Sequence, residues 1–170
     1  ISYHPGDKPL MERWAAHVKK LGPYLKHEMV LCPAHNASTD GVLLPLENCF
    51  RKVSVVHNRY PETGWPVSCN RSFQTIAWHS MLVLKQPFLF MEPDAIPLKE
   101  GWIDAIEAEY LAKGMPFMGD FVELTKALGN EPGVIDHMSG IAVYHWELSR
   151  YAPRVFNCTS QDQHGKESEY

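Results

Sequence analysis

The sequence predicts an α/β fold in which a mostly parallel central sheet is flanked by helices. Short apolar segments rich in β-branched or aromatic residues alternate with longer segments whose apolar residues recur every three or four positions. Turn-forming Gly and Pro residues separate the two kinds of segment. Strands that alternate with helices form βαβ units, and such units cover both faces of a parallel sheet. We expect one domain that spans residues 1–170.

The first segments are predicted to form a strand and a helix. Residues 1–4 are expected to end a strand, which the turn-forming sequence HPGD interrupts. A helix follows, because Pro9 fits a first helical turn and Gly22 with Pro23 stops it. The apolar face of this helix consists of Leu10, Trp14, Val18 and Leu21.

Two further strands are predicted before the middle of the chain. Residues 28–32 form a short apolar segment, and residues 52–58 alternate and are rich in β-branched residues. Residues 33–41 are rich in turn formers and are expected to be a loop. Residues 41–50 stay ambiguous, because Pro45 interrupts them.

A helix and a fully apolar strand are predicted next. The helix covers residues 70–84, and Pro87 prevents its continuation. The strand at residues 88–91, FLFM, is apolar throughout, which is typical of the centre of a parallel sheet. The apolar face of the helix consists of Phe73, Ile76, Ala77, Met81 and Leu84.

The rest of the chain adds one helix and two strands. The helix ends at Gly114, and its apolar face consists of Trp102, Ile103, Ile106, Tyr110 and Leu111. Strands are expected over residues 116–122 and 139–146, with a loop-like segment at 123–137 between them. The tail, residues 157–170, is polar and has no apolar period.

Composition and charge exclude some classes of function. Hydrophobic residues make up 45% of the chain and charged residues 21%, as in ordinary globular proteins. The net charge of -4 argues against a generally basic nucleic-acid binder, although a local basic groove stays open. No apolar run approaches the roughly 20 residues that cross a bilayer, so we expect no membrane partner. The chain begins with Ile1 rather than Met, so we expect the natural N-terminus to lie outside this sequence.

The cysteines and sequons bear on the compartment. None of the four cysteines belongs to a CxxC pair, which disfavours a zinc knuckle. We expect free thiols in a reducing compartment, and hence a cytoplasmic location. Three Asn-x-Ser/Thr sequons, at Asn36, Asn70 and Asn157, keep the secretory pathway open as an alternative.

Two carboxylates follow the FLFM strand directly. Glu92 and Asp94 stand at i and i+2, so in an extended segment they project on one side, and Pro93 and Pro97 stiffen that segment. In α/β sheets, ligands sit at the carboxyl ends of strands. Two carboxylates at such a place suit Mg²⁺ or Mn²⁺, which bind few carboxylates together with substrate phosphates. The alternative is that these acids only stabilise the start of the following helix.

The EPD sequence at residues 92–94 resembles the DxD motif that follows a central strand in GT-A nucleotide-sugar glycosyltransferases. The resemblance covers most of the chain. ISYHPGD is similar to the first strand and loop of such enzymes, and NRSFQTIAW is similar to the helix before the motif. PFMGDFV and HMSGIAVYHWEL are similar to the acceptor-side strands. The combination is similar to GT-A-like proteins of bacterial viruses and bacteria.

The resemblance implies a fold, an activity and cofactors. It implies a GT-A-like sheet, with residues 1–98 on the nucleotide side and 99–170 on the acceptor side. It implies transfer of a sugar from a UDP-sugar to an acceptor hydroxyl, with Mn²⁺ or Mg²⁺ as cofactor. Because the chain is short for this class, we expect a second protein subunit to supply further acceptor contacts.

The resemblance also implies roles for residues near the donor. Asp94 would hold the metal, with Glu92 nearby, either against the ribose or next to the ligands of the metal. Arg71 would approach the nucleotide or its phosphates from the start of its helix. The nucleotide would be bordered by Tyr3, His4 and Asp7.

Late residues would complete the metal site and supply the base. His164 is the first candidate for a metal-binding histidine, and His137 is the second. An inverting enzyme needs a general base to take the proton of the acceptor hydroxyl. Asp162 and Asp120 are the candidates for this base.

Each candidate has a structural interpretation beside the functional one. These interpretations are strand-end residues for Tyr3 and His4, a helix cap for Asp7, a surface charge for Arg71, a turn residue for Asp120, a polar loop residue for His137, and a polar tail for Asp162 and His164.

The acceptor is the least determined part of the hypothesis. The likeness to viral proteins favours DNA that carries hydroxymethylated pyrimidines of the 5-hydroxymethylcytosine type, whose bases would have to be flipped out of the duplex. A basic groove could then include Arg51, Lys52, His57 and Arg59, which could equally form a solvated strand edge. A carbohydrate or protein acceptor is the alternative.

Two other classes compete with a glycosyltransferase. A non-catalytic GT-A-like subunit that supports a partner chain stays open. A nucleotidyltransferase is disfavoured, because it would want a Gly-rich basic loop where HPGDKP has one Gly and one Lys. Hydrolase, NTPase and dinucleotide-binding motifs do not occur in the sequence.

Overall fold

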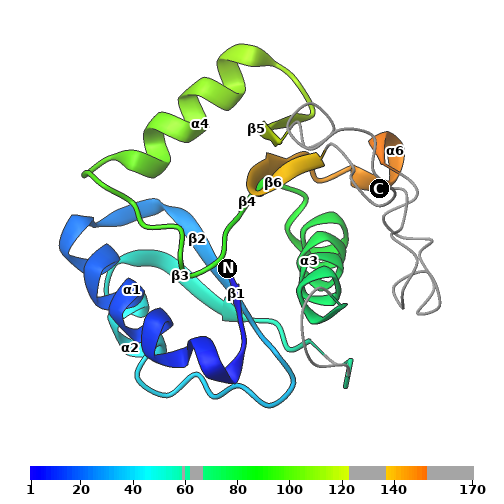
Figure 1. Cartoon of the computed structure of the whole chain (residues 1–170). Coiled ribbons are helices and arrows are strands. Elements are labelled where there is room, and N and C mark those ends of the chain that lie inside the picture. The colour runs from blue at the N-terminus through cyan, green and yellow to red at the C-terminus, as the bar shows by residue number, and fades with distance from the viewer. Residues whose placement is uncertain (59, 62–66, 123–136, 153–170) are drawn as a thin grey trace.

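The structure, a computed structural model, describes residues 1–58, 60–61, 67–122 and 137–152. These residues contain two three-stranded sheets (Figure 1). The first sheet is parallel in the order β1-β2-β3, and the second is antiparallel in the order β4-β6-β5. The strands are β1 (Ser2–Tyr3), β2 (Tyr24–Pro33), β3 (Phe50–Val55), β4 (Phe88–Phe90), β5 (Phe117–Val122) and β6 (His137–Tyr144).

Helices connect the strands and cover the parallel sheet. In Figure 1, α1 and α2 lie on one side of this sheet and α3 lies on the other. The last turns of α3 continue as a π-helical segment, η2. The helices are the short 3-10 helix η1 (Pro5–Asp7), α1 (Lys8–Leu21), α2 (Leu43–Glu47), α3 (Val67–His79), η2 (Ser80–Leu84), α4 (Trp102–Lys113) and α6 (Leu148–Tyr151).

The central strand β2 is buried on both faces. Successive side chains of a strand point to opposite sides of its sheet. Leu31 and Cys32 are both fully buried, yet Leu31 packs with Trp14 of α1, whereas Cys32 packs with Ile76 of α3 and Phe90 of β4. This two-sided burial explains why the β2 sequence ends in the apolar run Met29–Pro33.

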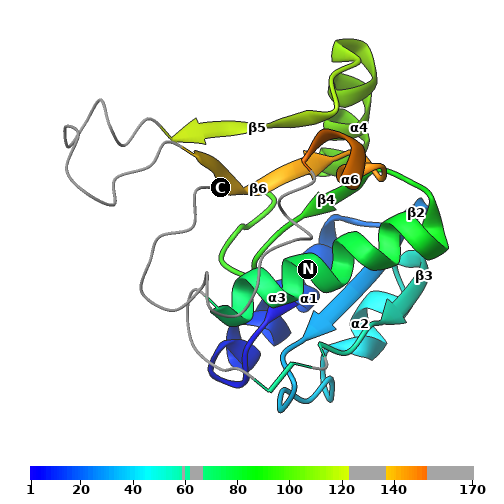
Figure 2. The ribbon, with the colours of Figure 1, turned by 90° about the vertical axis from the view of Figure 1, so that its right-hand side faces the viewer.

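The two sheets adjoin at the strands β1 and β4. The backbone N–H of Ser2, at the start of β1, donates a hydrogen bond of 3.3 Å to the carbonyl oxygen of Met91, which directly follows β4. Strands β4 and β5 both run antiparallel to β6 and therefore run parallel to each other (Figure 2). Their carboxyl ends accordingly lie at one edge of the second sheet.

Helix α4 is held against the parallel sheet by buried aromatic residues. The indole Nε1–H of Trp102 donates to the hydroxyl of Tyr24, and that hydroxyl donates to the carbonyl oxygen of Val18, each over 3.0 Å. The Tyr24 ring also stacks on Phe50 of β3 with 4.7 Å between ring centroids. One phenol therefore joins α1, β2, β3 and α4.

The prediction of a mixed α/β fold with a parallel sheet and flanking helices is confirmed in its coarse form, but the late strands form a separate antiparallel sheet. FLFM was expected in a parallel sheet, but β4 pairs antiparallel with β6. Its apolar character has a different cause: Leu89 packs against the core cluster that contains α1, and Phe90 packs under α3. A continuous apolar run reports burial on both faces, not strand direction.

Several local expectations differ from the structure at element ends. The ambiguous segment forms the short helix α2 with Pro45 inside it, and α3 begins three residues before the expected Asn70. Strand β6 begins at His137, which was expected to end a loop. The short helix α6 was not expected. Among the described residues, no helix is both long and apolar enough to cross a membrane.

Removal of the Tyr24 hydroxyl tests how much the contacts of Tyr24 with α1 and α4 stabilise the fold. The substitution Tyr24→Phe leaves the buried Trp102 N–H without its acceptor, so we expect a loss of about 1–3 kcal/mol in the free energy of unfolding, measured by urea denaturation. The control is Tyr151→Phe, because that ring is 43% exposed and its substitution should change stability by less than about 0.5 kcal/mol. Equal effects of the two substitutions on stability would contradict the proposed role of the Tyr24 hydroxyl.

Candidate functional site

The EPD residues form a tight turn at the carboxyl end of β4. The backbone N–H of Ala95 donates to the carbonyl oxygen of Glu92 over 3.1 Å, which closes a four-residue turn. The expectation of an extended segment with both acids on one side is therefore wrong. The physical reason is Pro93, because proline at the second position of a turn has the backbone angle that the turn needs. Glu92 is half-buried and Asp94 is exposed.

Helix α1 fixes the loop that carries these acids. The indole Nε1–H of Trp14 donates to the carbonyl oxygen of Ala95 over 2.9 Å, and Trp14 is 3% exposed. The Nε2 atom of His17 lies 2.8 Å from the carbonyl oxygen of Pro97, where only a protonated nitrogen can act as donor. Two side chains one turn apart on α1 therefore hold the backbone just after Asp94.

The charges of three of the expected site carboxylates act on one thiol. Cys69, on the first turn of α3, donates a hydrogen bond to Glu92 Oε1. Burial, this hydrogen bond, and the negative charges of Glu92, Asp7 and Asp94 raise the pKa of the Cys69 thiol to about 12. The structure therefore brings residues from the loop after β1, the start of α3 and the loop after β4 into one group, called here the acidic cluster: Asp7, Cys69, Glu92 and Asp94.

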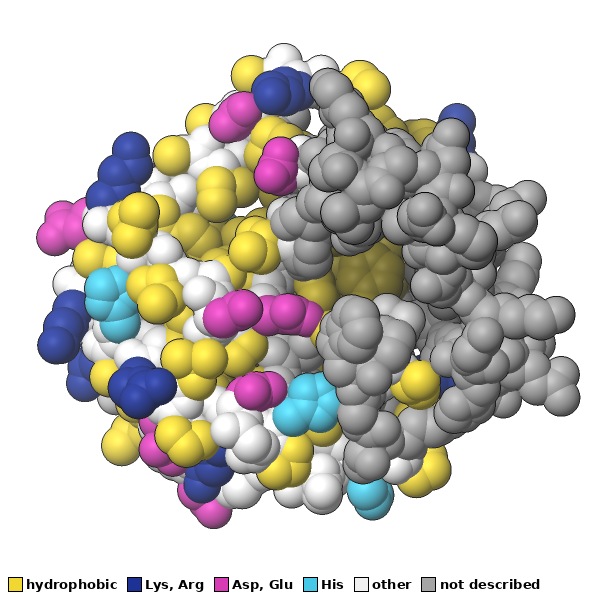
Figure 3. All heavy atoms as spheres, in the orientation of Figure 1, with side chains coloured by type: hydrophobic (Ala, Val, Ile, Leu, Met, Phe, Trp, Pro, Cys, Tyr) yellow, Lys and Arg dark blue, Asp and Glu magenta, His cyan; other side chains and the backbone are white. Residues whose placement is uncertain are grey.

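The acidic cluster lies on one face of the molecule. Figure 3 shows acidic side chains and a histidine gathered near the middle of this face, over the loop after β4 and the start of α1. Carboxylates that lie close together repel one another, and a divalent cation relieves that repulsion. Carboxylate oxygens are the ligands that Mg²⁺ and Mn²⁺ prefer. No three residues of the acidic cluster bring ligand atoms within 4.8 Å of one another among the described residues, so a cation would need the exposed Asp94 carboxylate to turn toward it.

The end of β1 provides a buried tyrosine and a turn. Tyr3 is 2% exposed, and its hydroxyl donates to the carbonyl oxygen of Ser38 over 3.0 Å. Burial, with a contribution from the charge of Asp40, raises the pKa of Tyr3 to about 12. The backbone N–H of His4 donates to Asp7 Oδ2 over 3.1 Å, so Asp7 stabilises the turn that starts η1. Tyr3 lies within the core cluster, whereas His4 is half-buried beside the acidic cluster.

Arg71 is buried, which contradicts its interpretation as a surface charge. Its side chain is 8% exposed, one guanidinium nitrogen donates to Gln74 Oε1 over 3.0 Å, and the guanidinium lies 4.4 Å from the centroid of the Tyr60 ring. Residues two positions apart on a helix do not share a face. Arg71 therefore points away from the side of α3 that carries Cys69, toward the segment that contains Tyr60.

The expected late residues are not assembled with the acidic cluster in the part of the chain that the structure describes. Asp120 is exposed on β5, where the pairing with β6 is irregular. Strand β6 lies between β5 and β4, so β5 is two strand spacings, roughly 10 Å, from β4. His137 begins β6 opposite Val122, at the same edge as the carboxyl end of β4. Asp162 and His164 lie outside the described residues.

Cys69 is the member of the cluster that sequence reasoning missed. The signals that mark functional cysteines are a CxxC spacing or a nearby catalytic histidine in a known motif, and Cys69 has neither. Its place follows only from the docking of α3 beside β1 and β4, which a single sequence does not determine.

A cavity that could hold a ligand lies beside the acidic cluster rather than over it. A cavity of about 550 Å³ lies between β2, β4, the end of α3 and α4, and Asp7, Glu92 and Asp94 are not among its lining residues. Trp14 and Met91 line this cavity and also adjoin the EPD loop. The acids carry the chemical argument, because the cavity walls near the loop are apolar.

Comparison with protein-family models, with curated proteins and with solved structures finds no match for this chain. The function is therefore inferred from the residues themselves and from how the fold arranges them.

The reactivity of Cys69 provides a test of the acidic cluster. The thiolate is the form of cysteine that reacts with iodoacetamide, so a raised pKa slows the reaction. The substitution Glu92→Gln removes a negative charge and changes the hydrogen bond, so we expect the pKa of Cys69 to fall and its alkylation at pH 8 to become severalfold faster. The rate is measured by mass spectrometry in the presence of EDTA.

The matched control is Glu100→Gln, which removes an exposed carboxylate outside the cluster and should leave the Cys69 rate unchanged. If the two substitutions had the same effect on this rate, the charges of the acids would not act on the thiol as described.

Proposed function

We propose that this chain is a metal-dependent glycosyltransferase that transfers a sugar from a UDP-sugar to an acceptor hydroxyl, and that its fold is of the GT-A type. One observation carries the proposal: Asp7, Glu92 and Asp94 gather at the carboxyl ends of two adjoining strands, β1 and β4. In α/β sheets this is the place where ligands bind. An EPD turn at this place supports the resemblance to the DxD motif.

Asp94 would hold the cation in this proposal, with Glu92 beside it and with His164, which lies outside the described residues, as the expected histidine ligand. Asp94 is exposed and can turn its carboxylate toward a bound metal, whereas Glu92 is half-buried and fixed by the Cys69 thiol. A bound Mn²⁺ or Mg²⁺ would neutralise the negative charge of the diphosphate leaving group. The rigid attachment of the loop to Trp14 and His17 favours this role, because preorganised groups need no reorganisation during the reaction.

Further donor contacts in this proposal come from His4, beside the acidic cluster, and from Arg71, on the side of α3 that faces away from Cys69. His4 is half-buried beside Asp7, where its ring can approach a nucleotide. Arg71 keeps its proposed role on the nucleotide side, and the Tyr60 ring next to it, 40% exposed, offers an aromatic surface on which a base can stack. Tyr3 supports the site from within the core rather than by direct contact with the nucleotide.

The acceptor side of the proposal involves β5, β3 and a DNA substrate. Asp120 is exposed and keeps its proposed role as general base, with Asp162 as the other candidate. Arg51 of the expected basic groove pairs with Glu28 over 2.7 Å, while Lys52 and His57 are exposed. Hydroxymethylated pyrimidines in DNA are the proposed acceptor. A second subunit would supply contacts that the described residues lack.

We also propose a cytoplasmic location. The three cysteines within the described residues, Cys32, Cys49 and Cys69, carry free thiols. Free thiols are typical of proteins in reducing compartments. The sequon at Asn70 lies on α3 at a half-buried position, where a glycan would be hard to accommodate.

Titration calorimetry with UDP tests the donor site. We expect wild-type protein to bind UDP in the presence of Mn²⁺ and to lose that binding in EDTA. The substitution Asp94→Asn removes the charge that holds the cation and should weaken UDP binding by at least about tenfold, or roughly 1.4 kcal/mol. Glu109→Gln is the control, because this exposed residue of α4 pairs only with Lys113 among the described residues. Metal-independent UDP binding, or equal affinity in both variants, would contradict the proposal.

Incubation with a UDP-sugar and DNA then tests the acceptor. We expect a mass increase on DNA that contains 5-hydroxymethylcytosine and none on unmodified DNA of the same sequence. UDP binding without transfer to this DNA would direct the search to carbohydrate or protein acceptors. If UDP does not bind at all, a non-catalytic subunit becomes the better interpretation.

A further inference from the structure

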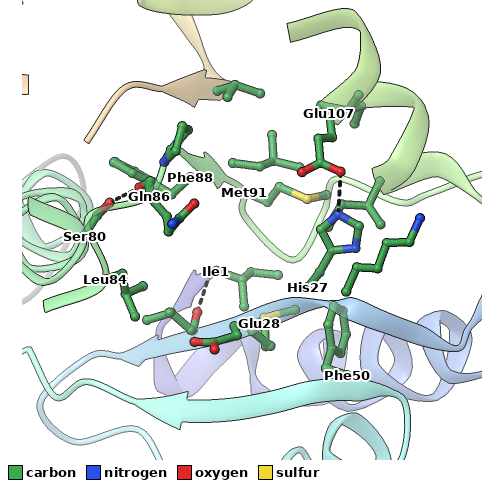
Figure 4. A pocket seen from close by; sticks show the side chains of 18 of the residues that line it. Ile1, His27, Glu28, Phe50, Ser80, Leu84, Gln86, Phe88, Met91 and Glu107 are labelled. Atoms are coloured by element: carbon green, nitrogen blue, oxygen red, sulfur yellow. Dashed lines mark hydrogen bonds and ion pairs between the residues drawn. The ribbon is translucent and has the colours of Figure 1, made fainter. Parts of the chain in front are cut away.

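A second group of potential metal ligands lies between β2 and α4, away from the acidic cluster. His27 projects from β2, and Asp104 and Glu107 stand three positions apart on α4, so their side chains share a face. Nε2 of His27 is 3.4 Å from Glu107 Oε2 and 4.0 Å from Asp104 Oδ1. Figure 4 shows the His27 ring and the Glu107 carboxylate pointing toward each other across the cavity edge.

The His27 nitrogen that faces the acids is buried and has no hydrogen-bond partner among the described residues. The side chain as a whole is 15% exposed, but the Nε2 atom is covered. The contact with Glu107 does not satisfy this nitrogen, because its geometry is not that of a hydrogen bond. A buried nitrogen without a partner is unfavourable, so its direction toward two carboxylates points to a bound group.

The distances suit a cation placed between the three side chains. Zn²⁺ binds His nitrogen and carboxylate oxygen at about 2.0–2.2 Å in a tetrahedral arrangement, so two such ligands lie roughly 3.3–3.5 Å apart. The Nε2 to Oε2 distance of 3.4 Å has this value, and the 4.0 Å to Asp104 closes with a small rotation of an exposed side chain. Glu107 and Asp104 are 54% and 55% exposed, so a cation can reach them from solvent.

We propose that His27, Asp104 and Glu107 form a binding site for a divalent transition-metal ion of the Zn²⁺ type. Imidazole is a ligand that favours zinc over magnesium, which separates this site chemically from the carboxylate site at Asp94. Three protein ligands leave a fourth position open. His27 and Glu107 also line the cavity of about 550 Å³, so a small ligand in that cavity could occupy the open position.

The proposed ion would join α4 to the parallel sheet. Besides the hydrogen bond of Trp102 to Tyr24, the contact of His27 with Asp104 and Glu107 is the other polar link between α4 and β2 among the described residues. An ion that binds the folded protein but not the unfolded chain stabilises the folded state. The proposed ion should therefore raise the melting temperature.

Titration of metal-free protein with Co²⁺ and Zn²⁺ tests this site. We expect Co²⁺ to give visible absorption bands of low-coordinate nitrogen and oxygen ligation, which Zn²⁺ then removes by displacement. His27→Ala and Glu107→Gln should each weaken Zn²⁺ affinity by at least roughly tenfold. Loss of a residue that only hydrogen-bonds to a metal ligand already weakens metal affinity by about that factor. The same substitutions should abolish the rise of the melting temperature that Zn²⁺ causes in wild-type protein.

Two matched controls accompany these variants. Glu109→Gln changes a neighbouring exposed acid of α4, and His35→Ala changes an exposed loop histidine. Both should bind Zn²⁺ as wild-type protein does. Because Glu107 is exposed, Glu107→Gln keeps the test valid if His27→Ala fails to fold.

The outcomes separate this site from the donor site. Loss of Zn²⁺ binding in Cys69→Ser or Asp94→Asn, but not in the His27 and Glu107 variants, would place the ion at the acidic cluster and overturn the proposal. Equal binding by all variants would overturn it as well, and so would the absence of binding, since the three residues would then be only an ion pair. Zn²⁺ binding at His27 is independent of whether UDP binds, so either proposal can fail alone.

Discussion

The candidate site depends on the contact between β1 and the residue after β4. The hydrogen bond from Ser2 to Met91 places two strand ends side by side, although the residues are far apart in the chain. Asp7 lies at the end of η1, just after β1, and Glu92 follows Met91, so this contact brings the two segments that carry these carboxylates near each other. Helix α3, which packs over β1 and β2, then brings Cys69 between them. Without this pairing the acids would be separate turn residues.

Concentrating carboxylates at one point is unfavourable unless something holds them there. The fold holds Asp7 and Glu92 by hydrogen bonds from the His4 N–H and the Cys69 thiol, while Trp14 and His17 hold the backbone after Asp94. The backbone that follows Asp94 is therefore tied to α1, whose Trp14 belongs to the core cluster. The raised pKa of Cys69 is a consequence of this arrangement, since an uncharged thiol is the form that tolerates such neighbours.

The fold was predictable where a residue's neighbours in sequence determine its structure. The end of α1 at Gly22 and the loop after β2 follow from turn residues, and the structure agrees. The predicted apolar face of α1 is confirmed at Trp14 and Val18, whereas Met11 and Ala15 are buried where Leu10 and Leu21 were expected. The direction of β4 and the turn at Glu92 were predicted wrongly, because both are set by partners distant in sequence or by the choice among turn conformations that proline allows. The position of Asp94 after a buried strand was readable, whereas Cys69 required the docking of α3.

Helix α4 relates the two proposed cation sites. The chain passes from Asp94 through a loop held by α1 directly into α4, whose first residue, Trp102, is fixed to Tyr24. Both ends of this connection are therefore attached to the same core cluster, which contains Trp14, Tyr24 and Trp102. A cation between His27 and α4 would strengthen the attachment at one end and leave the EPD turn, already fixed at Ala95, in place. The structure therefore favours a stabilising role for the ion at His27 over a direct role in the chemistry at Asp94.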